Sequence, residues 1–153
     1  MPAAGGGRVR TCPGPAASVL LVAALCLAAA ASASAKDRVV FFSTPSRGIG
    51  CVFSDPAKGA SFLRCDVLDP AHPPKRPASC ELDWGTAFGL SPRGHGRRLC
   101  VGDTALSQDA RVLGYGHHRR LGPFRCASRR TGLRCTNRAH HGFSLARERQ
   151  RLF

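Results

Sequence analysis

The sequence predicts an all-β fold: a small single domain of antiparallel hairpins, sandwich- or barrel-like, held by disulfides. Short runs of β-branched and aromatic residues alternate with turn-forming residues, as in small β-proteins. Helical signals are scarce after residue 35. Six cysteines also follow an export-like N-terminus, and an even number in a short exported chain is typical of a disulfide framework. These are Cys51, Cys65, Cys80, Cys100, Cys126 and Cys135.

Residues 1–35 have the pattern of an export signal that precedes the β domain, and we expect a signal helix there. Arg8 and Arg10 supply the positive charge, a long apolar run follows, and two Ala-Ser-Ala triplets end at Ala33 and Ala35. We therefore expect cleavage near Ala33 or Ala35 and a secreted, extracellular protein. An uncleaved N-terminal membrane anchor is the alternative.

The remaining segment, residues 36–153, has the size of one domain. Cys12 and Cys26 lie in the signal and would leave with it, so the mature chain keeps an even number of cysteines. A chain this short buries a modest share of its surface, and each disulfide loop adds about 3 kcal/mol to its stability. No second apolar span follows, so we expect no transmembrane segment after cleavage.

The first predicted strand, residues 39–42, is a β-branched and aromatic run ended by turn residues. Residues 49–54 and 61–67 flank an Asp-Pro-Ala-Lys-Gly-Ala segment, which is strong turn chemistry, and we expect a hairpin. Its register places Phe53 opposite Leu63. The same register places Cys51 opposite Cys65, so a disulfide can join the two strands.

Residues 69–79 contain four prolines, which exclude a helix or a central strand and predict an extended connector. Residues 86–90 and 97–101 then form the second predicted hairpin around a Gly-containing turn. Residues 112–115 are a predicted short strand.

The third predicted hairpin joins residues 122–127 to residues 132–137 and places Cys126 opposite Cys135. Residues 142–146 are predicted as the last strand. The end of the chain, residues 147–153, is predicted as a basic tail or a short helical turn.

These registers favour three disulfides, 51–65, 126–135 and, for the remaining pair, 80–100. Two hairpins bring their cysteines within the Cα separation that a disulfide needs. A metal site is the competing interpretation, but the sequence has no C-x-x-C or H-x-x-x-H pair at zinc-ligand spacing. We expect no metal and no cofactor.

Positive charge is concentrated in the second half of the mature chain. Residues 36–92 hold seven Lys and Arg against six Asp and Glu, whereas residues 93–153 hold fourteen against three. Such a half can attract anionic polymers through its summed field. A merely solvated basic surface is the alternative. The candidate anion-binding residues are Arg119, Arg120, Arg129, Arg130 and Arg134.

Catalytic signatures are weak. Five histidines, His95, His117, His118, His140 and His141, lie in the basic half, and a pair of them on opposite sides of a phosphate could cleave a phosphodiester. Solvent-exposed loop histidines are the simpler interpretation. Asp83 and Asp103 form a candidate carboxylate pair, but aspartates in such contexts usually cap turns. We predict no catalytic residue and no enzymatic activity.

Several segments together resemble a known family. They are Phe42-Ser43-Thr44-Pro45-Ser46, Ile49-Gly50-Cys51, Cys65-Asp66, Asp83-Trp84-Gly85, Cys100-Val101-Gly102-Asp103-Thr104, Tyr115-Gly116, Phe124-Arg125-Cys126, Gly132-Leu133-Arg134-Cys135-Thr136-Asn137 and His141-Gly142-Phe143-Ser144-Leu145. With them the chain resembles small, exported, uncharacterised proteins of high-GC actinobacteria, classed as a domain of unknown function. In the turn between the first two of these segments, this chain has Arg47-Gly48 where the family would be expected to have Gly-Asn. The resemblance implies export and a disulfide framework, and it implies no catalytic residue.

The leading hypothesis is a secreted or cell-envelope-associated, non-enzymatic module that binds an anionic extracellular ligand, such as an anionic cell-wall polymer. Nucleic acid is a poor candidate because the mature chain has a single Tyr and a single Trp to stack on bases. The alternative is a secreted, nuclease-like hydrolase that uses the histidines of the basic half. A structural or antimicrobial cationic protein is a third hypothesis.

Overall fold

The computed structural model describes residues 36–153, and the predicted signal with its two cysteines lies outside this part. Eleven strands and no helix make up the described chain, so no helix within residues 36–153 is long and apolar enough to span a membrane. The strands are β1 Arg38–Ser43, β2 Ile49–Asp55, β3 Phe62–Val67, β4 Asp83–Leu90, β5 Arg97–Val101, β6 Arg111–Val112, β7 His118–Leu121, β8 Phe124–Arg129, β9 Gly132–Thr136, β10 Gly142–Leu145 and β11 Gln150–Leu152.

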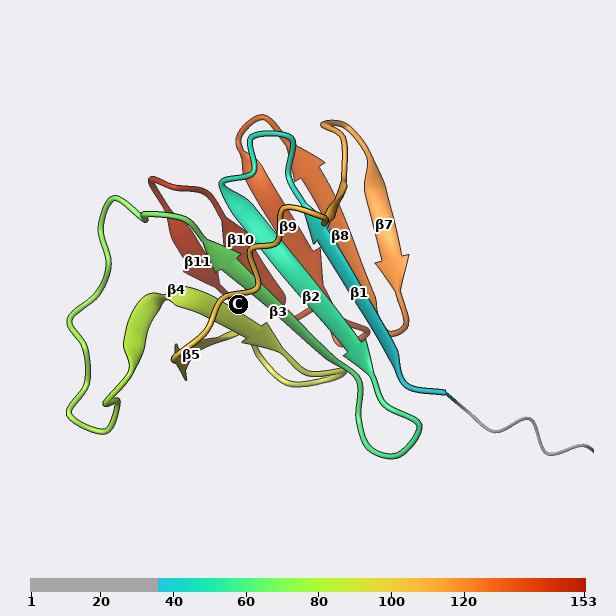
Figure 1. Cartoon of the computed structure of the whole chain (residues 1–153), viewed down its shortest axis with the longest axis horizontal. Helices are drawn as coiled ribbons and strands as arrows, with labels where there is room; N and C mark the ends of the chain where they lie inside the picture. The colour runs from blue at the N-terminus through green and yellow to red at the C-terminus, as the bar shows by residue number, and fades with distance from the viewer. Residues whose placement is uncertain (1–35) are drawn as a thin grey trace, which may run out of the picture. The chain divides into compact units, whose positions relative to one another are not determined.

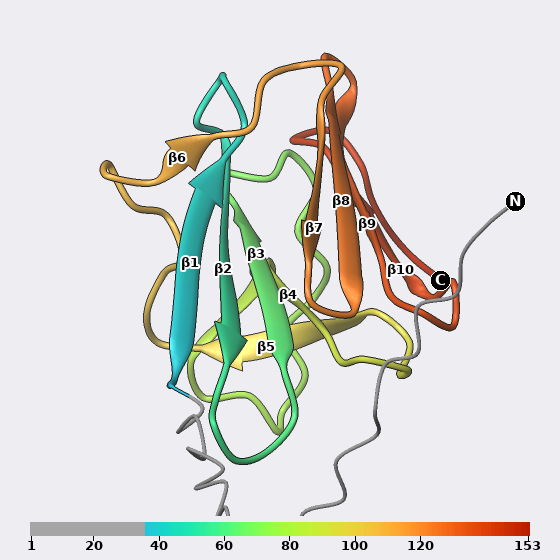
Figure 2. The same ribbon diagram turned by 90° about the vertical axis from the view of Figure 1, so that its right-hand side faces the viewer.

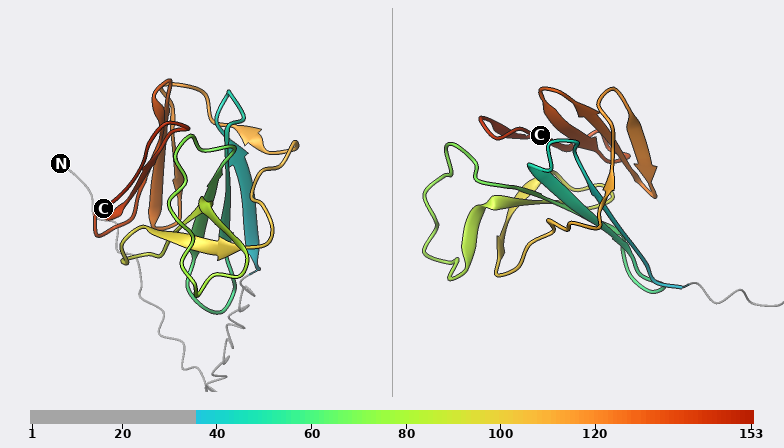
Figure 3. Two further views of the ribbon diagram at one scale, coloured as in Figure 1. Left: turned by 90° about the vertical axis from the view of Figure 1, so that its left-hand side faces the viewer. Right: turned by 45° about the horizontal axis from the view of Figure 1, so that its top comes forward.

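The strands form two sheets that face one another (Figures 1 and 2). Sheet A has the order β5-β4-β3-β2-β1-β6, and sheet B has the order β11-β10-β9-β8-β7. Neighbours pair antiparallel except β1 and β6, which are parallel. The predicted all-β, disulfide-held fold is confirmed. Of the two architectures expected, sandwich and barrel, the structure is a sandwich. The two layers are seen edge-on in the right-hand view of Figure 3.

One hydrophobic core fills the space between the sheets. Alternate residues of each strand point into it, as the two-residue period of a strand requires. Aromatic side chains of the two sheets meet there: Phe53 contacts Phe124 edge-on with ring centroids 6.0 Å apart, and Phe88 lies 6.4 Å from Phe143. Aromatic pairs in these arrangements contribute about 0.5–1.5 kcal/mol beyond their buried area.

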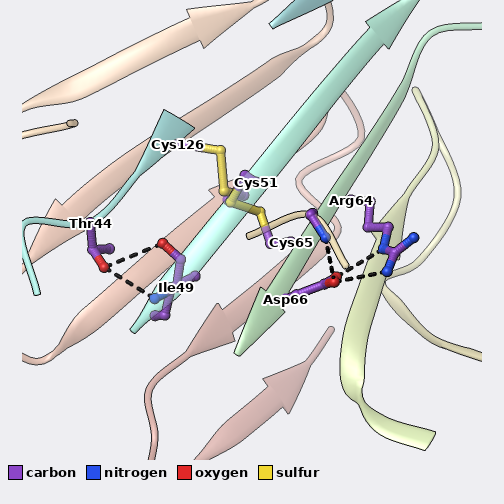
Figure 4. Close-up of a disulfide and its surroundings, with 9 residues drawn as sticks. Thr44, Ile49, Cys51, Arg64, Cys65, Asp66 and Cys126 are labelled. Carbon is purple, nitrogen blue, oxygen red and sulfur yellow. Dashed lines mark hydrogen bonds and ion pairs between the residues drawn. A yellow bond between two sulfur atoms is a disulfide. The ribbon is translucent and has the colours of Figure 1, made fainter. Parts of the chain in front are cut away.

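Three disulfides link Cys51 to Cys65, Cys80 to Cys100, and Cys126 to Cys135. These are the pairs that the hairpin registers predict. Cys51 lies directly opposite Cys65 on β2 and β3, and Cys126 lies opposite Cys135 on β8 and β9. Both bridges point into the core, and Figure 4 shows the first with Cys126 in its surroundings.

The predicted register of Phe53 opposite Leu63 is also confirmed, but two other predictions are wrong and one strand was not predicted. Residues 147–153 are neither a tail nor a helical turn, because Gln150–Leu152 pairs with β10 as an edge strand. The short strand predicted at residues 112–115 is Arg111–Val112, placed by pairing with β1. The sequence also missed β7, a charged edge strand whose residues pair with β8.

The segment between β5 and β6 crosses the outer side of sheet A (amber in Figure 1). An ion-pair network, buried at Asp66 and exposed at Asp103, holds it there. Arg64 on β3 makes a two-point contact with Asp66, at 2.9 and 2.8 Å, and a 2.6 Å hydrogen bond to Asp103 of the crossing segment. The Asp66 carboxylate also accepts the backbone N–H of Ala105 at 2.8 Å (Figure 4). This network fixes the segment that carries the chain from β5, at one edge of sheet A, to β6 at the other edge.

Asn137 joins the sheets at one end of the sandwich. Its side-chain amide donates to the backbone carbonyls of Ser91 and Gly94, in the turn between β4 and β5, at 2.8 and 2.7 Å. Its side-chain oxygen accepts from the N–H groups of Ala139 and His141. The side chain is 5% exposed, so water cannot replace these bonds.

We expect Asn137→Ala to lower the free energy of unfolding by about 2 kcal/mol, because it leaves four part-buried backbone groups without their side-chain partner. Urea unfolding followed by tryptophan fluorescence measures this. The matched control is Arg138→Ala at the exposed neighbouring residue, which should change the free energy by less than about 0.5 kcal/mol. Equal effects of the two substitutions would contradict the assigned role.

A second prediction concerns pH. The hydrogen bond and charge of Arg64 hold the pKa of the Asp103 carboxyl below its usual value. A depressed pKa in the folded state means that the contact stabilises the fold above the unfolded pKa, about 3.9, and is lost as the pH falls further. Asp103→Asn should therefore reduce the free energy of unfolding at neutral pH and have a progressively smaller effect in acid. A difference from the unsubstituted protein that does not shrink in acid would refute this.

Candidate anionic-ligand site

The outer side of sheet B is covered by arginines. Strand alternation causes this, because the cysteines and apolar residues of β8 and β9 occupy the inner positions and leave the intervening arginines outside. Phe124, Cys126 and Ser128 are buried, whereas Arg125 and Arg129 between and beside them are exposed. We call this outer side, with the residues given next, the basic face.

Strand pairing arranges the basic face in three rows that run across the strands. The first row is His118, Ala127, Arg134, Ser144 and Arg151. The second row is Arg120, Arg125, Thr136, Gly142 and Phe153. The third row begins with Arg129 and Gly132 and reaches Ala146 and Arg149, which exchange backbone hydrogen bonds. Each row carries two arginines, and all six are exposed.

No carboxylate opposes these arginines on the strands of sheet B. The strands β7 to β11 contain no Asp or Glu. Glu148, in the turn between β10 and β11, is the one acidic residue between Arg111 and Phe153. Protein surfaces that are only solvated usually mix both signs of charge. A one-signed face instead generates a field that attracts anions.

A groove of about 880 Å³ lies beside the third row, at one end of the sandwich. One wall is formed by the turns of sheet B and contributes Arg129, Arg130, Arg149 and Arg151. The opposite wall comes from sheet A and includes Thr44 and Ser46 of the β1–β2 turn and Leu68 and Asp69 after β3. The groove is therefore a continuation of the basic face, lined by arginines and hydroxyl groups.

Two aromatic rings hold arginines of the site in place. The guanidinium of Arg134 lies 4.1 Å from the ring centroid of Phe153, and that of Arg130 lies 5.4 Å from the centroid of Tyr115. Stacking on a ring restricts a long side chain without using its N–H donors. These arginines stay free to donate to a ligand.

Arg147, also in the groove wall, is already paired. Its guanidinium donates to Asp69 and Glu148 at 3.1 Å each, and these contacts raise its pKa. Because all three side chains are exposed, the ion pairs contribute little to stability. They remove one cation from the groove and leave four others in the part of the chain described here.

The structure brings four of the five predicted anion-binding residues together. Arg120, Arg129 and Arg134 lie on the basic face, and Arg130 lines the groove. Arg119 does not join them. It pairs with Cys126, so it lies on the inner side of β7, where its guanidinium lies 5.9 Å from the ring centroid of Phe42.

The sequence analysis missed Arg125, Arg149 and Arg151, and it missed the two aromatic rings. A signal for Arg125 was present, because it directly precedes Cys126 and must point the opposite way if that cysteine is inside. Arg149 and Arg151 had no such signal. Their place on the face depends on β11, which the sequence did not predict.

The five candidate histidines are not arranged as acid–base cleavage of a phosphodiester requires, with two imidazoles on opposite sides of one phosphate. The rings of His95 and His141 stack with centroids 3.6 Å apart, which leaves no room for a phosphate between them. His117, His118 and His140 are exposed. Within residues 36–153, no three His, Cys, Asp or Glu side chains gather in a way that could hold a metal.

Asp83 and Asp103 line a second hollow, of about 420 Å³, on the side of sheet A. Arg64 lowers the pKa of Asp103 mainly through its hydrogen bond. A general acid in glycoside cleavage needs the opposite, a raised pKa that keeps its proton at working pH. Asp103 is therefore suited to holding the crossing segment rather than to proton donation.

The stacking of Arg134 on Phe153 can be measured by a double-mutant cycle. Arg134→Gln and Phe153→Leu should show a coupling of about 0.5–1 kcal/mol in the free energy of unfolding, as for an exposed cation–π pair. The control cycle uses Arg125→Gln with Phe153→Leu and should give no coupling, because three strand spacings separate those residues. Equal coupling in the two cycles would argue against the stack.

Comparisons with known proteins match the chain to a family model but to no individual protein. Neither the curated proteins nor the solved structures contain a match to the chain. One family model matches, over residues 19–153, and thus over all of the β-sandwich. The chain belongs to this family, the family of unknown function DUF6636.

Proposed function

We propose that the protein is a non-enzymatic binding module for an anionic extracellular ligand, and that the basic face and its groove are the binding surface. The observation that carries the proposal is the set of six exposed arginines in three rows, five on strands that contain no carboxylate and one, Arg149, in the turn between β10 and β11. Guanidinium groups bind carboxylates, sulfates and phosphates through two parallel hydrogen bonds. Several of them on one rigid sheet can bind a polymer with many anionic groups.

The proposal includes export and a place at the cell surface. Three disulfides are compatible with an oxidising compartment outside the cytoplasm. The Ala-, Arg-, Gly- and Pro-rich composition is compatible with origin in a high-GC actinobacterium. An anionic polymer of the cell envelope would then be available to the protein as its ligand.

Charge reversal tests the binding surface. Arg125→Glu combined with Arg134→Glu should weaken binding to dextran sulfate, a generic polyanion, by about tenfold or more at moderate salt, and should make the affinity less dependent on salt. Isothermal titration calorimetry at several salt concentrations measures both changes.

The matched control is Lys58→Glu combined with Lys75→Glu, which changes the net charge equally at exposed positions away from sheet B. It should leave most of the affinity intact. If the control weakens binding as much as the substitutions on sheet B, the net charge of the chain and not the basic face is responsible. Binding that does not depend on salt would contradict the proposal as well.

A further inference from the structure

We infer that the ligand is a linear acidic polysaccharide that lies across the strands of the basic face, with its acidic groups on the arginines and its neutral hydroxyls on Ser144 and Thr136. This inference rests on the function proposed above and narrows it to one class of polymer. It follows from the order of side chains within the rows.

Charged and neutral groups alternate along the first row. Arg134, Ser144 and Arg151 lie on three successive strands and are paired through β10. Neighbouring strands are about 4.8 Å apart, so the two arginines are about 10 Å apart with a hydroxyl between them. A bound chain would thus present an anionic group, a neutral hydrogen-bonding group and a second anionic group.

The second row also holds two arginines and one hydroxyl, but here the two arginines are neighbours and the hydroxyl follows them. Arg125 on β8 pairs with Thr136 on β9, and Arg120 lies on the far side of Arg125. The groove beside the third row adds the hydroxyls of Ser46 and Thr131 to its arginines. Arginine next to hydroxyl therefore recurs in the first two rows and in the groove. Sugars that carry both carboxylates and hydroxyls match it.

The other polyanions fit this surface less well. Single-stranded nucleic acid needs aromatic rings on which its bases can stack, and the rings of Phe153 and Tyr115 are stacked on arginines. Membrane surfaces are usually bound with apolar side chains that enter the lipid. Among the described residues, the large exposed apolar side chains lie outside sheet B: Val39, Phe41, Leu68, Leu82 and Val112.

The width of the basic face predicts how the affinity depends on the length of the ligand. Five strands at about 4.8 Å spacing give a width of about 19 Å across sheet B. An oligosaccharide shorter than this contacts only part of a row, and a longer one adds no contact within that row. Affinity should therefore rise with chain length and then level off, unlike the binding of a single small anion.

The test uses hyaluronan oligosaccharides of increasing length, in which carboxylate-bearing and neutral sugars alternate, together with inorganic polyphosphate, double-stranded DNA and anionic phospholipid vesicles. The affinity for hyaluronan should rise with length until the chain spans the sheet and should exceed that for the other three probes at equal salt.

Two variants separate the recognition of sugar from the attraction of charge. Ser144→Ala and Thr136→Val remove one hydroxyl each, and each should weaken hyaluronan binding about fivefold, the value of one hydrogen bond, while leaving polyphosphate binding unchanged. Arg134→Gln should weaken both.

The outcomes distinguish the two proposals. If all four probes bind equally and the hydroxyl variants have no effect, the polysaccharide inference is wrong while anion binding stands. Preferential binding to DNA or vesicles would replace the polysaccharide by that class of partner. If none of the probes binds more tightly to the unsubstituted protein than to the Arg125→Glu, Arg134→Glu variant, both proposals fail.

Discussion

The structure depends most on one constraint: the paired cysteines of each buried hairpin must both point into the core. Cys126 and Cys135 lie opposite one another with Cα atoms 4.1 Å apart, and their bridge ties β8 to β9 in a single register. A one-residue slip of either strand would turn its core side chains to solvent and its arginines inward. The disulfide thus determines where the positive charge of this hairpin points.

The same constraint acts on the first hairpin with a different result. Cys51 and Cys65 fix β2 against β3, and the residue beside the second cysteine, Arg64, also points outward. There, however, Asp66 and Asp103 neutralise Arg64, and the contact between Arg64 and Asp103 holds the crossing segment against sheet A. The two sheets therefore use outward arginines in different ways. In sheet A, the outward Arg64 is paired with two aspartates and holds the crossing segment, whereas the outward arginines of sheet B have no acidic partners on its strands.

The separation of charge between the two halves explains why the candidate site is a face rather than a cleft with a few special residues. Catalysis needs a small number of groups at exact distances, often with shifted pKa values. The basic face instead repeats one type of side chain at the spacing of a sheet. The affinity of such a surface comes from the number of contacts, and it is sensitive to salt. A polymer can use this arrangement better than a small molecule can.

Local patterns in the sequence predicted the three hairpins, two of them with a cysteine pair across their strands, because turn residues and alternating apolar residues specify register between neighbouring strands. They also predicted Arg120, Arg129, Arg130 and Arg134 as a group, since clustered charge is visible in the chain. The structure separates Arg119 from this group, because a run of arginines does not show which side chains lie on the inner side of a strand. That depends on the pairing of β7, whose His-Arg-Arg-Leu sequence carries little strand signal of its own.

The sequence by itself thus determined the fold class, the disulfides and the excess of positive charge, all of which follow from composition and from interactions between residues close in the chain. Only the tertiary structure decided that β11 closes sheet B and adds Arg151 to the face. It likewise decided that Phe153 stacks on Arg134 and that Asn137 reaches the β4–β5 turn. The strand β11 pairs with the strand just before it, but its Gln-Arg-Leu sequence is too short and polar to predict a strand by itself. The contacts of Phe153 and Asn137 join separate hairpins and turns, and the Asn137 contact exists only once the two sheets have packed around a common core.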